Sequence, residues 1–405
     1  MTWKMLLTGI AVALTAAACG SATGTTVENR PGSPEEATAT FDGSGEGPAV
    51  VSLPQGPSAL RDVFDDAFVE PLIDPRDLLI GGPPPDGIPS IDAPIFLDVA
   101  EHLEILPPTE PVIALEINGD ARAYPVRALV WHEIVNDTVG GVPVVITYCP
   151  LCNSAAAFDR RVAGAPTTFG TSGMLYHSAL VMYDRATESL WTHFDGTSVI
   201  GLLTGVVLEE YPSPLLAWSD FRAAYPTGAV LDWTRTGVSR DYGRNPYAGY
   251  DDPDSSPDLF RGNIDGRAAA MRRVVGIAVG DEAIAYPLDL LMGRSGSVTP
   301  VTVGGQDLSI FWTPGQASAL DDVTLAGGRD VGSVGVFKPV VEQMMLTFEY
   351  DGESFVDAET ASSWSIAGDA VAGPLKGARL ERVPHFDTFW FAWAAYEPTT
   401  ALVEE

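Results

Sequence analysis

The sequence predicts a β-rich α+β fold made of two tandem related units packed together, with short strands and few helices. Three observations lead to this prediction. Glycine and proline number 41 and 32 of 405 residues, 73 together, which suits a fold with many turns and short strands. Hydrophobic residues make up 46% of the chain, enough for one large core or two ordinary ones. Five segments of the chain return later in the same order.

The N-terminus has the pattern of an export signal. Lys4 precedes the apolar run MLLTGIAVALTAAAC, which ends in small residues before Cys19. We expect residues 1–18 to be a signal peptide and Cys19 to be lipidated, because AAAC resembles a bacterial lipoprotein box. The protein is then an extracytoplasmic lipoprotein anchored to the cell membrane, or a secreted protein if cleavage occurs without lipidation. The lipid anchor is its one expected membrane contact.

The next two segments lead into the fold. Residues 19–56 are rich in Gly, Ser, Thr, Glu and Pro and contain almost no large apolar residues, which is typical of a flexible tether. Residues 57–110 form a lead-in segment, in which GGPPPDGIPSIDAP predicts a rigid, turn-filled stretch. The first repeat unit is therefore expected to begin at residue 111.

The rest of the chain is predicted to hold a first unit, residues 111–231, a turn-rich linker, residues 232–272, and a second unit, residues 273–403. The units are recognised from matched words: DARAYPVRALV with EAIAYPLDLLM, VGGVPVVITY with VGGQDLSIFW, DRATESLW with DAETASSW, VIGLLTGVVLE with VAGPLKGARLE, and AWSDFRAAYPT with FWFAWAAYEPT. Five matches in one order indicate an internal duplication.

Within each unit the patterns predict short strands and one helix. PVIALEI and PVVITY are β-branched, apolar strand words, and the Gly-Gly of VNDTVGGVP predicts a hairpin turn. Aromatic and aliphatic residues recur at three- and four-residue spacing in LLAWSDFRAAY and in DTFWFAWAAY, which predicts a helix in each. The matched words pair Trp191 with Trp364 and Trp218 with Trp390. We expect all four rings in the core.

The charge of the chain excludes some partners. It has 23 basic and 54 acidic side chains, and the formal net charge of −31 repels phosphate backbones and anionic lipid headgroups. Nucleic acid is therefore not an expected partner, and the sequence identifies no protein partner. In the linker, Asp251, Asp252, Asp254 and Asp258 lack the spacing and glycine of a familiar calcium loop, so they are interpreted as a solvated surface loop.

The cysteines that remain after Cys19 lie in the first unit. Pairing PVVITYCPLC with DLSIFWTPGQ places Thr and Gln opposite Cys149 and Cys152, whereas the proline between them is shared. His132 and His177 also lack a histidine counterpart in the second unit. Residues that only build the fold should recur in both units, whereas a chemical site needs to be kept once. The first unit is therefore predicted to carry the site, and the second to be a degenerate, structural support.

The chain resembles the family named domain of unknown function 3179 (DUF3179). The matching words are LVWHEIVNDTVGGVPVVITYCPLCNSAAAFDRR, LVMYDRATESLW, YGRNPYAGYDD and FWFAWAA, which extend from about Gly81 to Ala401. The resemblance implies a bacterial protein with a lipoprotein-like or signal-bearing start, and it implies no activity. It also implies that His132, Cys149 and Cys152 follow the family pattern, whereas other members often have Asn in place of His177.

The turn YCPLC has three interpretations, and the first is a soft-metal site. Pro150 fixes the backbone, so the thiols of Cys149 and Cys152 can converge on one ion. Copper, as Cu(I), is the expected metal, because two thiolates satisfy a soft ion whereas zinc requires four ligands. His132 is the best third ligand, since the predicted hairpin returns it close to Cys149. His177 is a further candidate ligand.

Two methionines are further candidate ligands, and the YCPLC turn has two more interpretations. The thioethers of Met174 and Met182 are additional candidate ligands, with core packing as their alternative role. The remaining histidines are interpreted as structural: His102, His193 and His385.

The second interpretation of the YCPLC turn is thiol–disulfide exchange. This chemistry favours a cysteine at a helix N-terminus, but the residues after Cys152 favour a strand. The third is a structural disulfide closing a small loop, and a non-catalytic binding module is a different class of alternative.

The sequence lacks the motifs of familiar catalytic sites. GGPPPDG and GTSG have neither the strand nor the helix that a phosphate loop or a dinucleotide fingerprint requires. No nucleophile triad is present, and no carboxylate pair is distinguished among 54 acidic residues. No nucleotide cofactor and no catalytic residue are therefore predicted.

Replacing Cys19 with Ser is expected to release the protein from membranes into the soluble fraction, because the acyl anchor would be lost. Cell fractionation followed by immunoblotting measures this, with Cys152→Ser as a matched control that should stay membrane-bound. Equal membrane retention of Cys19→Ser and wild type would contradict the lipidation prediction.

Overall fold

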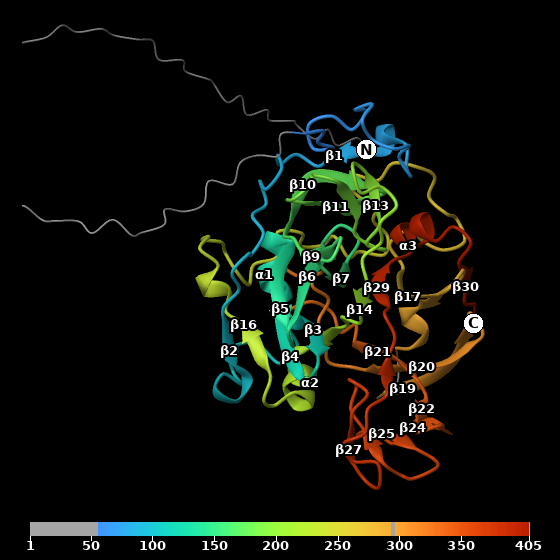
Figure 1. The fold of residues 1–405 in the computed structure, drawn as a ribbon. Helices are drawn as coiled ribbons and strands as arrows, with labels where there is room; N and C mark the ends of the chain where they lie inside the picture. The colour runs from blue at the N-terminus through green and yellow to red at the C-terminus, as the bar shows by residue number, and fades with distance from the viewer. Residues whose placement is uncertain (1–55, 293–295, 405) are drawn as a thin grey trace, which may run out of the picture. The chain divides into compact units, whose positions relative to one another are not determined.

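The regular structure of the described residues is mainly short strands, with three α-helices (Figure 1). The computed structural model describes residues 56–292 and 296–404. Residues 1–55, which hold the predicted signal peptide, Cys19 and nearly all of the predicted tether, lie outside the described residues. The prediction of a β-rich fold with short strands and few helices is confirmed. No helix within the described residues is long and apolar enough to span a membrane.

The two predicted helices are present, and a third helix was not predicted. α2 (Trp218–Ala224) and α3 (Trp390–Tyr396) fall within LLAWSDFRAAY and DTFWFAWAAY. α1 (Val126–His132) follows Pro125 and ends at Glu133, whose φ of 58° and ψ of −33° cannot continue a helix. α1 has seven residues, two turns, which is too short for a helical period to be recognised in the sequence.

Strands before residue 232 form three larger sheets and one small one. The strand orders are β15 (Leu215–Ala217), β3 (Pro111–Ile117), β4 (Asp120–Pro125), β16 (Ala229–Leu231), β2 (Phe96–Asp98); β14 (Glu210–Tyr211), β7 (Ser154–Asp159), β6 (Val142–Cys149), β5 (Ile134–Val139); β1 (Leu79–Ile80), β10 (Phe169–Tyr176), β11 (Ala179–Asp184), β12 (Leu190–Thr192), β13 (Ser198–Ile200); and β8 (Arg161–Val162), β9 (Ala165–Pro166). In the first sheet β16 lies parallel to β4, and the other pairs are antiparallel.

Strands after residue 272 also form three larger sheets and one small one. The strand orders are β29 (Phe386–Phe389), β17 (Arg273–Val279), β18 (Glu282–Pro287), β30 (Ala401–Leu402); β19 (Ser297–Val303), β20 (Gln306–Thr313), β21 (Ser333–Lys338), β28 (Glu381–Arg382); β24 (Phe348–Tyr350), β25 (Phe355–Asp357), β26 (Ser363–Trp364), β27 (Ala370–Ala372); and β22 (Val340–Val341), β23 (Met344–Met345). Here β30 lies parallel to β18, as β16 does to β4.

Four short 3₁₀ helices complete the regular structure of residues 56–292 and 296–404. They are η1 (Pro75–Asp77), η2 (Val99–Glu101), η3 (Trp233–Arg235) and η4 (Leu288–Leu290). By its contacts, the segment Ser52–Glu405 forms one compact unit. Both groups of sheets therefore belong to a single body.

The predicted Gly-Gly hairpin connects β5 and β6. Gly140 and Gly141 have φ of 54° and 84°, the left-handed conformation that a type I′ turn requires. A Cβ atom on Gly140 would lie 2.1 Å from the carbonyl oxygen of Ile117, so only glycine fits there. Gly304 and Gly305, with φ of 56° and 70°, form the corresponding turn between β19 and β20. These turns fix the register of both hairpins.

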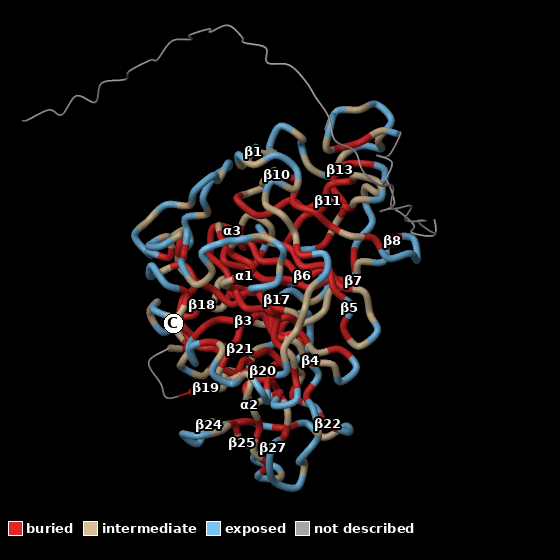
Figure 2. Tube along the Cα trace, turned by 90° about the vertical axis from the view of Figure 1, so that its left-hand side faces the viewer, coloured by how far each residue is buried: buried red, intermediate tan, exposed pale blue. Residues whose placement is uncertain are grey.

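The core contains the tryptophans that the sequence predicts there. All four are fully buried: Trp191, Trp218, Trp364 and Trp390. Figure 2 shows buried residues gathered on strands such as β3, β6 and β17, with exposed residues along the connecting loops. The indole N–H of Trp191 donates to Asp184 at 3.1 Å, and that of Trp364 donates to Asp357 at 2.9 Å. The indoles of Trp191 and Trp364 therefore each have a hydrogen-bond acceptor, as burial of this polar group requires.

Trp191→Ala is expected to lower the free energy of unfolding by about 3 to 5 kcal/mol, because it leaves a large cavity and removes a donor to Asp184. Urea unfolding followed by circular dichroism measures this. Phe64→Ala is the control, since this ring is 61% exposed and its loss should change stability by no more than about 0.5 kcal/mol. A change below about 1 kcal/mol for Trp191→Ala would contradict its core role.

Candidate functional site

The two cysteines lie on one tight turn between paired strands. Cys149 ends β6 and pairs with Ser154, which begins β7, so Pro150 to Asn153 form the connection. Asn153 has a φ of 50°, and its backbone N–H donates to the Pro150 carbonyl at 3.2 Å. Both cysteines are free thiols, 2% and 0% exposed. The prediction of a strand rather than a helix after Cys152 is confirmed.

Residues from distant parts of the chain hold this turn in place. The carbonyl oxygen of Cys152 accepts hydrogen bonds from the Thr388 hydroxyl at 2.7 Å and from the Phe389 backbone N–H at 3.3 Å. Both donors belong to β29, which contacts β7. The Tyr250 hydroxyl donates to the Leu151 carbonyl at 2.9 Å. Tyr250 of the linker and two residues of β29 therefore fix the backbone of the cysteine turn.

A buried chain of polar side chains continues from Cys152 into the core. Its sulfur lies 3.0 Å from the Ser154 hydroxyl, which is 2.7 Å from Nε2 of His193. Nδ1 of His193 is in turn hydrogen-bonded to the Thr147 hydroxyl at 2.9 Å. Burial lowers the pKa of His193 to about 3, so this ring is neutral at physiological pH. Burial and the neighbouring Cys149 raise the pKa of the Cys152 thiol.

The sequence interpretation of His193 as purely structural missed this connection. His193 follows Trp191 by two residues, and the same offset from Trp364 reaches Ile366. His193 therefore lacks a histidine counterpart in the second unit, like the cysteines. This mismatch is the signal that could have identified it.

His132 does not have the position that the sequence predicts. Its Nδ1 bonds to the Pro89 carbonyl and its Nε2 to the Tyr242 hydroxyl, both at 2.7 Å, and the ring stacks on Tyr242. Neither nitrogen is free for an ion held by the cysteines. Among the described residues, no group of three or more His, Cys, Asp or Glu is arranged to hold a metal ion. The predicted set of Cys149, Cys152 and His132 is therefore not assembled.

The other candidate ligands have separate surroundings. His177 lies in the turn between β10 and β11, where Nδ1 bonds to the Arg261 carbonyl at 3.2 Å. Met174 lines a cavity beside the cysteine turn, and Met182 is buried in β11. The Cys149 thiol instead donates to the Ser178 carbonyl at 3.7 Å. None of these three residues is therefore placed as an additional ligand of an ion held by the two cysteine sulfurs.

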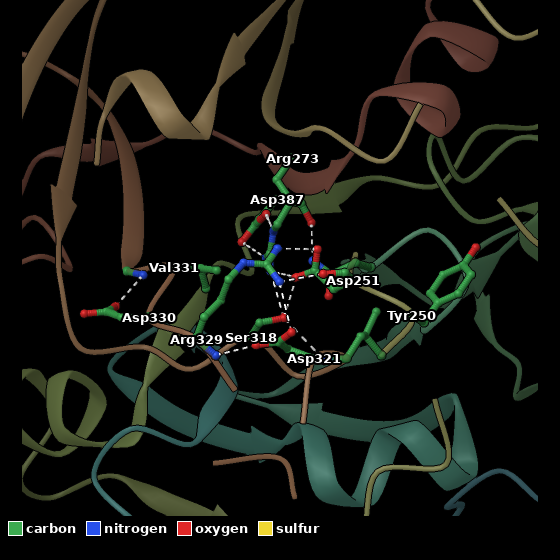
Figure 3. Close-up of polar contacts among 12 residues, drawn as sticks. Tyr250, Asp251, Arg273, Ser318, Asp321, Arg329, Asp330, Val331 and Asp387 are labelled. Carbon is green, nitrogen blue, oxygen red and sulfur yellow. Dashed lines mark hydrogen bonds and ion pairs between the residues drawn. The ribbon is translucent and has the colours of Figure 1, made fainter. Parts of the chain in front are cut away.

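A buried ionic network is hydrogen-bonded to the cysteine turn, and Figure 3 shows its charged side chains Arg273, Asp251 and Asp387 pointing toward one another. Arg273 donates to Asp387 through two nitrogens and to Asp251 at 3.0 Å, and Arg329 pairs with the second oxygen of Asp251 at 2.6 Å. The backbone carbonyl of Asp387 accepts a hydrogen bond from the Asn153 side chain at 3.2 Å. The network is thereby joined to the cysteine turn.

The position of Asp251 corrects the interpretation of the linker as a solvated loop. Asp252, Asp254 and Asp258 are exposed, as that interpretation requires. Asp251 is 1% exposed, because its carboxylate is paired with Arg273 and Arg329. No partner of Asp251 was predicted, since both arginines lie outside the linker.

A cavity of about 430 Å³ lies beside the cysteine turn. Leu151, between the two cysteines, lines it together with Glu133, Met174, Tyr247 and other residues. Burial raises the pKa of Glu133 to about 7. A carboxyl group with a perturbed pKa in a cavity is a common mark of a functional site. Nothing in the sequence distinguishes Glu133, because it is one of 54 acidic residues.

Glu133→Gln is expected to stabilise the protein at pH 8 by on the order of 1 to 3 kcal/mol and to have little effect at pH 4. The folded pKa of about 7 lies above the usual glutamate value of 4.5, so the ionised side chain costs stability above pH 7. This cost disappears as the pH falls through 7 to 4.5, because the folded state binds the proton first. Urea unfolding at both pH values measures it.

The exposed Glu353 provides the control for that experiment, since Glu353→Gln should leave stability unchanged at pH 8. A lower stability of Glu133→Gln at pH 8 would show that the Glu133 carboxylate is stabilised in the fold, contrary to this expectation.

The comparisons with known proteins identify a family and no individual relative. No curated protein and no solved structure matches the chain. The family described as "Protein of unknown function (DUF3179)" matches residues 85–400, which include the cysteine turn, the linker and α3. This span covers most of the 405 residues and confirms the resemblance found in the sequence. The chain belongs to the DUF3179 family.

Proposed function

We propose that the protein binds one Cu(I) ion through the thiolates of Cys149 and Cys152. The observation that carries this proposal is the presence of two free, buried thiols on a single fixed turn. Soft thiolate ligands select Cu(I), and two of them can satisfy it. A structural zinc site would need four ligands, and the described residues gather no such group.

The surroundings of the thiols support a bound cation. Burial disfavours a free Cys152 thiolate, so the proton is readily lost only when a positive ion replaces it. The Ser154 hydroxyl, 3.0 Å from the sulfur, can then donate a hydrogen bond to the thiolate. His193 and Thr147 hold Ser154 in that place. These three side chains would orient the Cys152 thiolate, as residues that hydrogen-bond to a metal ligand commonly do.

The thiol–disulfide alternative has weaker support from the surroundings. An attacking cysteine in such proteins has a lowered pKa, usually from a helix N-terminus. Here a strand follows Cys152, and its pKa is raised. A structural disulfide would close a loop of only four residues and would stabilise the fold little.

We further propose that the protein is anchored to the membrane outside the cytoplasm and that its two units arose by duplication. The export signal and Cys19 support a membrane-anchored protein outside the cytoplasm. A duplication of one unit is supported by three pairs of sheets with corresponding strand orders. It is also supported by the loops that precede Trp191 and Trp364, in which Asp184 and Asp357 accept equivalent hydrogen bonds. The cysteines occur in the first unit alone.

The full-length protein, purified under reducing conditions, is expected to take up about one equivalent of Cu(I), measured by competition with a chromogenic Cu(I) chelator. Cys149→Ser and Cys152→Ser should each abolish this uptake, because a single buried thiolate would be an incomplete site. His177→Ala is the matched control and should bind copper as wild type does, since its ring nitrogen bonds to Arg261.

Equal copper uptake by the wild type and by the double cysteine variant would reject the proposal. Intact mass measurement of protein purified without reductant adds a second test. A loss of two protons that reductant reverses, together with no copper uptake, would favour the thiol–disulfide alternative.

A further inference from the structure

The cavity beside the cysteine turn has the size and walls of a small-molecule site. Its volume of about 430 Å³ lies within the range of about 300 to 1,000 Å³ that is typical of ligand pockets. Apolar side chains from four segments line it, among them Ile88, Leu151, Met174, Leu175 and Leu180. These walls can remove an alkyl or aryl group from water.

The polar groups of this cavity are acidic or neutral. Glu133 lines it, and no hydrogen bond or ion pair to the Glu133 carboxylate is found within residues 56–292 and 296–404. Tyr247 contributes a phenol, and Asp258 lies at the exposed rim. No Lys, Arg or His is among the lining residues. The cavity therefore disfavours anions and has an unpaired carboxylate available to a cation.

Glu133 is held firmly at this position. It ends α1 with a φ of 58°, its backbone N–H donates to Leu129 at 2.7 Å, and its carbonyl accepts from Tyr148 at 2.8 Å. Hydrogen bonds on both sides fix a backbone conformation that is unfavourable for a residue other than glycine. The carboxylate is thus presented by a rigid segment.

We propose that this cavity binds a small organic cation, a primary amine that carries an apolar chain. The ammonium group would pair with Glu133, and the chain would lie against Leu151, Leu175 and Leu180. A metal ion is a poorer fit, because no group of three His, Cys, Asp or Glu is assembled among the described residues. The inference goes beyond copper binding and does not depend on it.

Isothermal titration calorimetry of the copper-free, full-length protein at pH 8 tests the proposal with three probes of equal chain length: hexylamine, hexan-1-ol and hexanoate. Hexylamine should bind at least about tenfold more tightly than hexan-1-ol, and hexanoate should not bind. Glu133→Gln should weaken hexylamine binding by about tenfold or more and leave hexan-1-ol binding unchanged. Glu353→Gln, at an exposed position, should leave all three probes unaffected.

A second variant tests the place of binding. Met174→Trp puts a larger side chain at the cavity wall and should weaken both hexylamine and hexan-1-ol binding. Three results would each overturn the proposal: equal hexylamine affinity in wild type and Glu133→Gln, unchanged hexylamine binding by Met174→Trp, or no binding of any probe at about 10 mM. Because the probes contain no thiol-binding group, failure here leaves the copper proposal untouched.

Discussion

The charge of the buried Arg273 side chain is the constraint on which the site depends. This side chain is 5% exposed, and the carboxylate side chains of its partners Asp251 and Asp387 are 0% and 6% exposed. Removing a single ion from water costs several kcal/mol, so each of these groups is tolerated only while its partners stay in place. Arg273 begins β17, Asp387 lies in β29, and Asp251 belongs to the linker. The three segments are therefore locked to one another.

Strand β29 connects this ionic network to the cysteine turn. Asp387 pairs with Arg273 through its side chain, while its carbonyl accepts from Asn153. The next two residues, Thr388 and Phe389, donate to the Cys152 carbonyl. The second half of the chain thus contributes hydrogen-bond donors and charge to the site, whereas the sulfurs come from the first half.

Local patterns in the sequence were sufficient for the β-rich class, the strands PVIALEI and PVVITY, the Gly-Gly hairpin turn, two helices and the buried tryptophans. The position of His132 was not predictable in this way. β5 and β6 do form a hairpin, and the Glu133 carbonyl accepts from Tyr148, so the backbone near His132 returns close to Cys149. The unpredicted helix α1 and the positive φ of Glu133 place the His132 ring against Pro89 and Tyr242 instead.

Long-range partners account for the other omissions. Asp251 reads as one acid among several in a polar loop, and only the fold reveals its two arginines. His193 reads as a core histidine, and its bond to Ser154 joins residues 39 positions apart. Such contacts follow from the packing of sheets, which a single sequence does not specify.

The hydrogen bond from Thr388 to the Cys152 carbonyl joins residues 236 positions apart. At a synthesis rate of roughly 5 to 20 residues per second, the donor emerges roughly 10 to 50 s after its acceptor. During that interval the cysteines exist in a chain that cannot yet enclose them. The enclosure of these thiols therefore requires the C-terminal part of the chain, and a chain that stops before β29 lacks both donors to the Cys152 carbonyl.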